Sequence, residues 1–187
     1  MAIRLFSKTK KTEQFERLAG ESERQVYAVC FHMMGNREDA QDCAQETMLR
    51  AFKAFDSFRR DALFSTWITR IAMNVCTDAL RKQRPVSSLD AIREETNFDV
   101  PDDAAPTAYA QLEQKERMRL LHEGLNELPE DMRQMIILRD MRGMRYDEIS
   151  ETLGIPLGTV KSRVNRAREK LGKILQQSSE LFSSHSV

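Results

Sequence analysis

The sequence predicts an all-α protein made of two small helical domains, joined by a flexible acidic linker, with a helix-turn-helix in the second domain. Apolar residues recur every three to four positions along most of the 187 residues, and no alternating strand pattern appears. Only seven glycines and five prolines are present, which favours helices over turn-rich architectures. The helical pattern stops at residues 86–108, where six acidic residues stand against one arginine. We therefore expect domains at residues 12–85 and 109–175, with this linker between them and a tail at residues 176–187.

The N-terminal domain is expected to begin with two helices. The first covers residues 12–34, breaks near Gly20 and ends at Gly35, which suits the left-handed position that follows a helix. Asn36 is the expected N-cap of the second helix, whose first turn is acidic. The apolar stripe of this second helix is Ala44, Met48, Ala51, Phe52 and Phe55.

A third helix follows a short charged loop at residues 58–64. Ser65 is its expected N-cap, and Pro85 stops it after Arg84. The apolar stripe of this helix is Ile68, Ile71, Ala72, Val75 and Ala79.

The C-terminal domain begins with a leucine-bearing helix after residue 109. Pro129 suits the start of the next helix, which Gly143 closes. A further helix, a sharp turn at Gly154 and a cation-rich helix follow over residues 145–171. This order is typical of a helix-turn-helix that reads the major groove of DNA.

Helical geometry divides the cation-rich helix into two faces. Advancing about 100° per residue from Val160 brings the other apolar residues, which should pack on the preceding helix, within roughly 40° of it. These residues are Val164, Ala167 and Leu171. The opposite face holds Gly158, Ser162, Asn165, Arg166 and Glu169, with Lys161 on its flank and Arg163 and Arg168 at the sides. We expect the outward face to meet base edges and the lateral cations to meet phosphates, while Thr159 at the positive helix end holds another phosphate.

A basic amphipathic helix can also be a solvated surface helix without a partner, or a helix that lies on a membrane surface. The apolar face here carries no bulky aromatic residue that would anchor it in a membrane. The turn and the division into faces favour DNA binding over both alternatives.

Composition argues against several classes of protein. The formal net charge is zero, so a uniformly basic nucleic-acid binder is excluded and local patches decide. No catalytic triad spacing, metal-ligand cluster or phosphate-binding loop appears, so no enzyme activity, metal or cofactor is expected. The lack of a signal peptide or membrane-length apolar run indicates a soluble, cytoplasmic protein. Cys30, Cys43 and Cys76 are widely spaced and odd in number, which is typical of buried inert thiols in a reducing compartment.

Two blocks of sequence resemble a known family. Residues 39–58 followed by residues 64–74 resemble the promoter-melting domain of bacterial sigma factors, and residues 128–139 and 158–171 are similar to their minus-35-reading domain. The chain, over about residues 12–175, resembles the extracytoplasmic-function sigma factors, which keep just these two domains. The resemblance implies a protein that binds core RNA polymerase, through its β′ clamp and β flap, and directs promoter recognition and transcription initiation. It also implies an anti-sigma factor as a partner, in this family often anchored in a membrane.

The resemblance implies roles for residues of the N-terminal domain. Asp42, Gln45 and Glu46 match the residues that dock on the β′ clamp, and their spacing places them on one helical face. Minus-10 DNA, with one base flipped out of the stack, would meet Phe58, Trp67, Arg70, Asn74 and Asp78. Asp78 replaces the asparagine of some relatives and accepts but does not donate hydrogen bonds, so the preferred base is open. For Trp67, stacking on DNA and burial in the core are both open.

The family's minus-35 contacts align with Lys161, Ser162, Asn165 and Arg166, which agrees with the outward face found from helical geometry. Relatives often carry an aromatic residue where Asn165 stands, whereas an asparagine would read adenine through hydrogen bonds. A stand-alone helix-turn-helix regulator is the competing hypothesis, but such a protein has no use for the Asp42–Glu46 face and usually dimerises.

Overall fold

The computed structural model describes residues 2–58, 63–83 and 108–183, and every regular element in them is helical. The predicted all-α class is therefore confirmed. The chain divides into two compact units, residues 1–85 and 86–187. Most of the predicted linker and the predicted end of the third helix at Arg84 and Pro85 lie outside the described residues.

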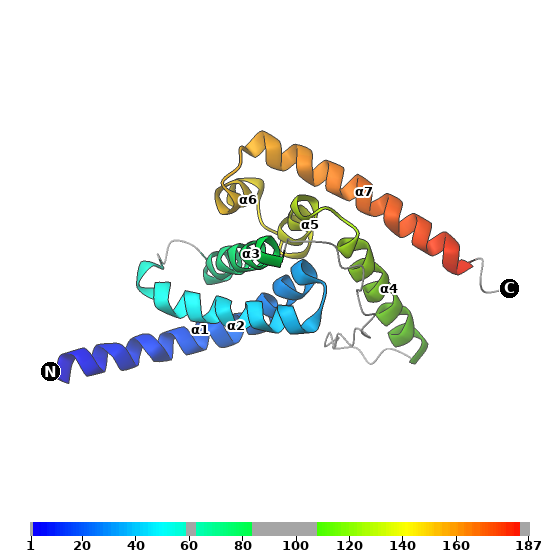
Figure 1. Ribbon diagram of the computed structural model, residues 1–187. Helices are drawn as coiled ribbons and strands as arrows, with labels where there is room; N and C mark the ends of the chain where they lie inside the picture. The colour runs from blue at the N-terminus through cyan, green and yellow to red at the C-terminus, as the bar shows by residue number, and fades with distance from the viewer. Residues whose placement is uncertain (1, 59–62, 84–107, 184–187) are drawn as a thin grey trace. The chain divides into compact units, whose positions relative to one another are not determined.

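The first unit is a bundle of three helices, with α1 at Ala2–Met34, α2 at Arg37–Ala54 and α3 at Phe64–Gln83. Each of these helices contacts the other two, and a short 3-10 turn, η1, follows α2 at Phe55–Ser57 (Figure 1). The centre of the bundle is formed by Val26, Val29, Cys30, Met33, Ala40, Cys43, Thr47, Ala51, Ile68, Ala72, Met73 and Cys76.

The junction between α1 and α2 follows the local chemistry expected from the sequence. Gly35 takes the left-handed conformation with φ 81°, and its backbone N–H donates to the Phe31 carbonyl. The Asn36 side chain accepts a hydrogen bond of 2.9 Å from the Asp39 backbone N–H. Both predicted roles are confirmed.

The break predicted near Gly20 is wrong, because α1 continues through it as one helix. Gly20 is exposed, and a glycine within a helix costs only about 1 kcal/mol. Phe15 and Val26, buried on either side of Gly20, hold the helix against the rest of the bundle.

The predicted N-cap Ser65 is also wrong, because α3 begins one residue earlier. The Leu63 carbonyl accepts the first backbone hydrogen bonds of the helix, from Thr66 and Trp67. Ser65 lies inside the first turn, where its carbonyl accepts the Thr69 hydroxyl at 2.7 Å. The start is set by Phe64, whose buried ring makes an edge contact with Phe55.

The apolar stripe predicted for α2 is only partly buried. Ala51 and Phe55 are in the core, but Phe52 is 39% exposed and Ala44 and Met48 are half-buried. The buried positions of α2 are Ala40, Cys43, Thr47 and Ala51. A threonine is tolerated there because its hydroxyl donates a 2.6 Å hydrogen bond to the Cys43 carbonyl. Ala44 and Met48 line a surface hollow described below, whereas the Phe52 ring makes an edge contact with Phe15.

The second unit is organised around a long helix. Its elements are α4 at Ala108–Asn126, α5 at Glu130–Ile136, a π-helical turn η2 at Ile137–Met141, α6 at Tyr146–Leu153 and α7 at Leu157–Ser183. Helix α7 contacts α4, α5 and α6 along its length (Figure 1). The stripe predicted for α7 is confirmed, since Val160, Val164, Ala167 and Leu171 are all buried.

Candidate functional site

The turn between α6 and α7 fixes the angle of the helix-turn-helix. Gly154 adopts the left-handed conformation with φ 64°, which is costly for residues that have a Cβ atom. The Ser150 hydroxyl donates to the Ile155 carbonyl at 2.6 Å, and the Ser150 carbonyl accepts the Ile155 N–H at 3.2 Å. Ile149, fully buried, anchors α6 within the unit. The turn therefore sets the direction in which the chain leaves α6 and enters α7.

The outward face of α7 is polar and cationic, as predicted. Lys161, Ser162, Asn165 and Arg166 are all exposed. The Arg166 guanidinium lies along the helix surface, with Nε 3.3 Å from the Ser162 carbonyl. Thr159, in the first turn of the helix, is half-buried. The exposed side chains of this face are therefore separate from the buried stripe of α7.

The two lateral cations of α7 are held by acids from the preceding elements. Arg168 forms two hydrogen bonds with the Asp140 carboxylate, one of them at 3.0 Å, and this raises the pKa of Arg168. Arg163 Nε lies 3.8 Å from a carboxylate oxygen of Asp131. Each guanidinium therefore lies next to a carboxylate at one side of α7 and remains partly exposed.

Arg139 is a cation next to the helix-turn-helix that the sequence analysis did not single out. Arg139 lies over the Tyr146 ring, 4.8 Å from its centroid, and donates a 2.8 Å hydrogen bond to the Met144 carbonyl. Arg139 thereby ties the π-helical turn η2 to the start of α6. Only the tertiary fold brings its guanidinium to this ring, so periodicity alone gave no signal.

On α2, the three predicted polymerase-binding residues share one surface. Asp42 and Gln45 are exposed, and the Glu46 side chain is 45% exposed. Arg50, one turn later, donates a 2.7 Å hydrogen bond to the Glu46 carboxylate, which lowers the pKa of Glu46. Arg50 therefore offsets the negative charge of Glu46 at one end of this α2 surface, while Asp42 adds a negative charge at the other end.

Arg50 also reaches the neighbouring helix. Its guanidinium donates a 3.2 Å hydrogen bond to Asp78 of α3, and Asp78 lies 3.7 Å from Arg81. Glu46, Arg50, Asp78 and Arg81 therefore form an ion-pair chain across α2 and α3. The helical spacing of Glu46 and Arg50 could have indicated the first link, but the link to Asp78 depends on how the helices pack.

The exposed face of α3 carries the other predicted minus-10 residues. Arg70 and Asn74 are exposed one turn apart, and Asp78 continues the same side with partial exposure. This face is therefore polar along its length, and it is linked to α2 through Arg50.

Phe58 and Trp67 lie together at the edge of an aromatic cluster that consists of Phe15, Phe52, Phe55, Phe58, Phe64 and Trp67. The Trp67 ring centroid is 5.1 Å from that of Phe58 and 5.4 Å from that of Phe64. Both Phe58 and Trp67 are half-buried. One side of each ring therefore packs on the core while part of its surface stays accessible.

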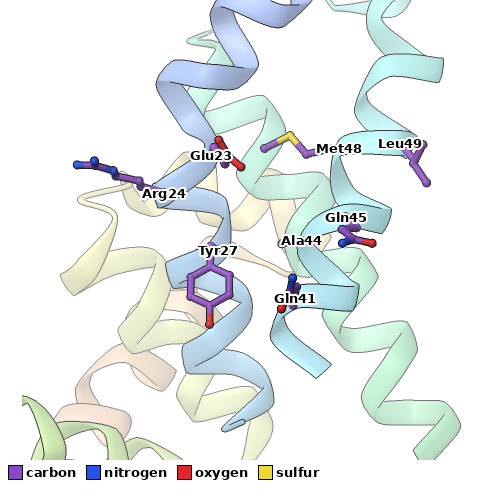
Figure 2. A pocket seen from close by; sticks show the side chains of 8 residues that line it. All are labelled: Glu23, Arg24, Tyr27, Gln41, Ala44, Gln45, Met48 and Leu49. Atoms are coloured by element: carbon purple, nitrogen blue, oxygen red, sulfur yellow. The ribbon is translucent and has the colours of Figure 1, made fainter. Parts of the chain in front are cut away.

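An open hollow of about 880 Å³ lies between α1 and α2. Its lining consists of Glu23, Arg24, Tyr27, Gln41, Ala44, Gln45, Met48 and Leu49 (Figure 2). Leu49 is 55% exposed, so the hollow has an accessible apolar rim. The predicted residue Gln45 belongs to this lining, which extends its surface toward α1.

Two general properties of the described residues complete the site. None of their helices has the length and apolar character needed to cross a membrane. In the same part of the chain, no group of three or more histidine, cysteine or acidic residues is placed to hold a metal ion.

Family comparisons match both units. The family described as sigma-70 region 2 matches residues 18–86, and that described as sigma-70 region 4 matches residues 118–171. The chain is 34% identical over 171 residues to the RNA polymerase sigma-H factor of Pseudomonas aeruginosa, covering 87% of this chain and 86% of that protein. It is 35% identical over 162 residues to the ECF RNA polymerase sigma factor SigW of Bacillus subtilis, with coverage of 81% and 83%.

Solved structures show a similar fold. The sigma factor RpoE in complex with the anti-sigma factor NepR, from Bartonella quintana, has a TM-score of 0.70 and 23% identity, over 88% of this chain and 98% of that one. CnrH in complex with the cytosolic domain of CnrY has a TM-score of 0.62 and 25% identity, over 89% and 90% of the two chains.

Proposed function

The chain belongs to the extracytoplasmic-function sigma factors of RNA polymerase, and from this we propose how its residues divide the work of promoter recognition. It binds core RNA polymerase and promoter DNA, and it directs promoter recognition and transcription initiation. Members of this family are not enzymes in general. Their specificity for promoters therefore depends on the surfaces that bind DNA and polymerase. The domain boundaries proposed from the sequence are residues 12–85 for polymerase and minus-10 binding, 86–108 for the linker, 109–175 for minus-35 binding and 176–187 for the tail.

Minus-35 recognition is assigned to the outward face of α7. Ser162, Asn165 and Arg166 meet base edges in the major groove, where an asparagine pairs best with adenine and an arginine with guanine. Phosphates on the groove walls are contacted by Thr159, Lys161, Arg163 and Arg168. The exposure of this polar face, directly opposite a fully buried apolar stripe, is the observation that carries the assignment.

The minus-10 element is assigned to α3 and the aromatic edge before it. Asn74 and Asp78 contact a base flipped from the melted strand, and Arg70 holds the backbone beside it. The half-exposed rings of Phe58 and Trp67 offer a surface on which an unstacked base can stack. A carboxylate at Asp78 accepts a hydrogen bond from an exocyclic amine such as that of cytosine.

Core polymerase is assigned to the α2 face formed by Asp42, Gln45 and Glu46. Its two carboxylates suit a cationic partner surface, and the adjacent hollow offers apolar contacts at Met48 and Leu49. The β′ clamp is the proposed partner here, and the β flap is proposed to meet the second unit. Because RpoE was solved with the anti-sigma factor NepR, we also propose that an anti-sigma factor binds this chain.

A pair of substitutions tests the separation of surfaces. Arg166→Ala should weaken use of minus-35-dependent promoters while core-polymerase affinity is unchanged. Glu46→Ala should weaken core-polymerase affinity while the minus-35 surface of the second unit is unaltered. Both quantities are measured with purified full-length protein, by fluorescence titration with core polymerase and by transcription from promoters with and without a minus-35 element. If both variants impaired the same step equally, the division of surfaces would be wrong.

A further inference from the structure

The three cysteines of the chain, far apart in sequence, converge inside the first unit. Cys30 comes from α1, Cys43 from α2 and Cys76 from α3, and all three are free thiols. Cys30 and Cys76 are 0% exposed, whereas Cys43 retains 5% of its surface. Each helix of the bundle therefore contributes one sulfur to a common cluster.

Cys76 is the central member of this cluster. Its thiol shares hydrogen bonds with both Cys30 and Cys43, and these bonds together with burial raise the pKa of Cys76. The pKa of Cys43 is lowered because the Cys76 S–H donates to it, although burial and the nearby Asp39 and Asp42 act in the opposite direction. The sulfur of Cys43 is thus the most accessible of the three, and its lowered pKa favours the thiolate over that of Cys76.

We propose that Cys43 and Cys76 form an oxidisable pair, which a hydroperoxide converts into a disulfide that joins α2 to α3. The Cys43 thiolate attacks the peroxide O–O bond, which gives a sulfenic acid and releases hydroxide or alkoxide. The Cys76 sulfur then attacks the Cys43 sulfenic sulfur, its proton leaves with the displaced hydroxyl as water, and the S–S bond forms. In the full reaction two thiols lose two electrons, and the peroxide is reduced to water and an alcohol, or to two waters if it is hydrogen peroxide.

The position of this pair gives oxidation a route to function, and this step rests on the proposed function above. Cys43 is the buried neighbour of Asp42 on α2, and Cys76 lies on the buried side of α3, two residues from both Asn74 and Asp78 of the minus-10 face. A disulfide fixes its sulfurs at about 2.05 Å, closer than two thiols in hydrogen-bond contact, so its formation draws the Cys43 and Cys76 side chains together and restrains α2 against α3. The ion pair between Arg50 and Asp78 spans the same two helices. We expect the disulfide to lower promoter opening several-fold.

Disulfide formation is tested on the purified, reduced full chain treated with hydrogen peroxide. Peptide mapping by mass spectrometry and thiol counting after denaturation should show loss of two of the three thiols and a Cys43–Cys76 linkage, both reversed by dithiothreitol. Cys30→Ala should lose both of its two thiols to the same Cys43–Cys76 linkage, whereas Cys43→Ala should form no such linkage. Circular dichroism before and after treatment confirms that the chain stays folded.

Three outcomes would overturn the proposed pair: survival of all three thiols in the folded wild-type chain, a linkage from Cys30 in that chain, or oxidation only after unfolding. Transcription with core polymerase is measured on the same samples, where wild type and Cys30→Ala should lose open complexes and Cys43→Ala should not. If the disulfide forms and transcription is unchanged, the regulatory consequence is overturned while the proposed pair stands. Failure of the sigma-factor assignment would instead appear in the reduced protein.

Discussion

Arg50 connects the two surfaces of the first unit that are assigned to different partners. It donates hydrogen bonds to Glu46 on the polymerase-binding face and to Asp78 on the minus-10 face. Its side chain is 41% exposed, so these bonds contribute little to the free energy of unfolding. Their consequence is positional, because one guanidinium orients two carboxylates that we assign to binding different partners.

Replacing Arg50 should therefore affect both functions without unfolding the protein. We expect Arg50→Ala to weaken core-polymerase binding and to change the preferred base at the minus-10 element, while the melting temperature moves little. Arg17→Ala is the matched control, because it removes an exposed i,i+4 ion pair with Glu21 from α1. Affinity for core polymerase and transcription from minus-10 variants are the measurements. Equal effects of the two substitutions would show that Arg50 acts only through net charge.

Asn165 is exposed on the outward face of α7, so its base preference should follow from amide chemistry. We expect Asn165→Ala to lose about 1–3 kcal/mol of discrimination at a single minus-35 base pair, which wild type reads as adenine. The measurement is binding or transcription across a set of promoters that differ at one position. Gln177→Ala removes an exposed amide farther along the same helix and should leave discrimination unchanged. A uniform loss across all sequences would assign Asn165 to the backbone instead.

At the scale of elements, the features predicted from the sequence are those set by local chemistry. The left-handed glycines at Gly35 and Gly154 and the cap at Asn36 each depend on neighbours within a few residues. The buried stripe of α7 followed from periodicity because one face of that helix meets α4, α5 and α6. These rules also defined the outward face, which is why that part of the candidate site could be predicted.

Features that depend on packing between distant segments were not predictable in this way. The ion pairs from Arg50 to Asp78 and from Arg168 to Asp140 each join residues 28 positions apart. Burial of Phe64 against Phe55 accompanies the start of α3, and the buried stripe of α2 is the one that packs against α1 and α3. The cysteine cluster arose in the same manner, since nothing in the spacing of three single cysteines brings them together.

The left-handed turn of the helix-turn-helix can be tested by making the same glycine-to-alanine substitution at two positions. Gly154 has φ 64° and Gly172 lies in the exposed middle of α7, and at both positions an added Cβ atom would meet no other atom within 4 Å. Gly154→Ala should lower the free energy of unfolding by about 1–2 kcal/mol, because alanine resists the left-handed conformation. Gly172→Ala should raise it by about 0.5–1 kcal/mol through helix propensity. Urea denaturation measures both, and a stabilising Gly154→Ala would contradict the left-handed turn.

At the scale of the whole molecule, zero net charge conceals a strong local asymmetry. Residues 155–175 carry six cations against one acid, while residues 86–108 carry six acids against one arginine. DNA binding through α7 should therefore be salt-dependent even though the chain as a whole is neutral. The net charge of the chain therefore does not indicate its local attraction for DNA.

Two separate cores predict two separate responses to cavity-forming substitutions. Ile68 in α3 and Ile149 in α6 are almost completely buried, with 1% and 0% exposure, and belong to different units. Replacing either residue with alanine should lower the free energy of unfolding of its own unit by about 2–5 kcal/mol, through lost burial and the cavity left behind. Because each unit has its own core, the cost should stay within it. Hydrogen exchange read by mass spectrometry measures this: Ile68→Ala should lower amide protection in residues 10–83 and leave that of α5–α7 unchanged, with the reverse for Ile149→Ala. Equal loss of protection in both units after either substitution would mean that they unfold as one cooperative body, and a defect in minus-35 reading could then no longer be attributed to the second unit alone.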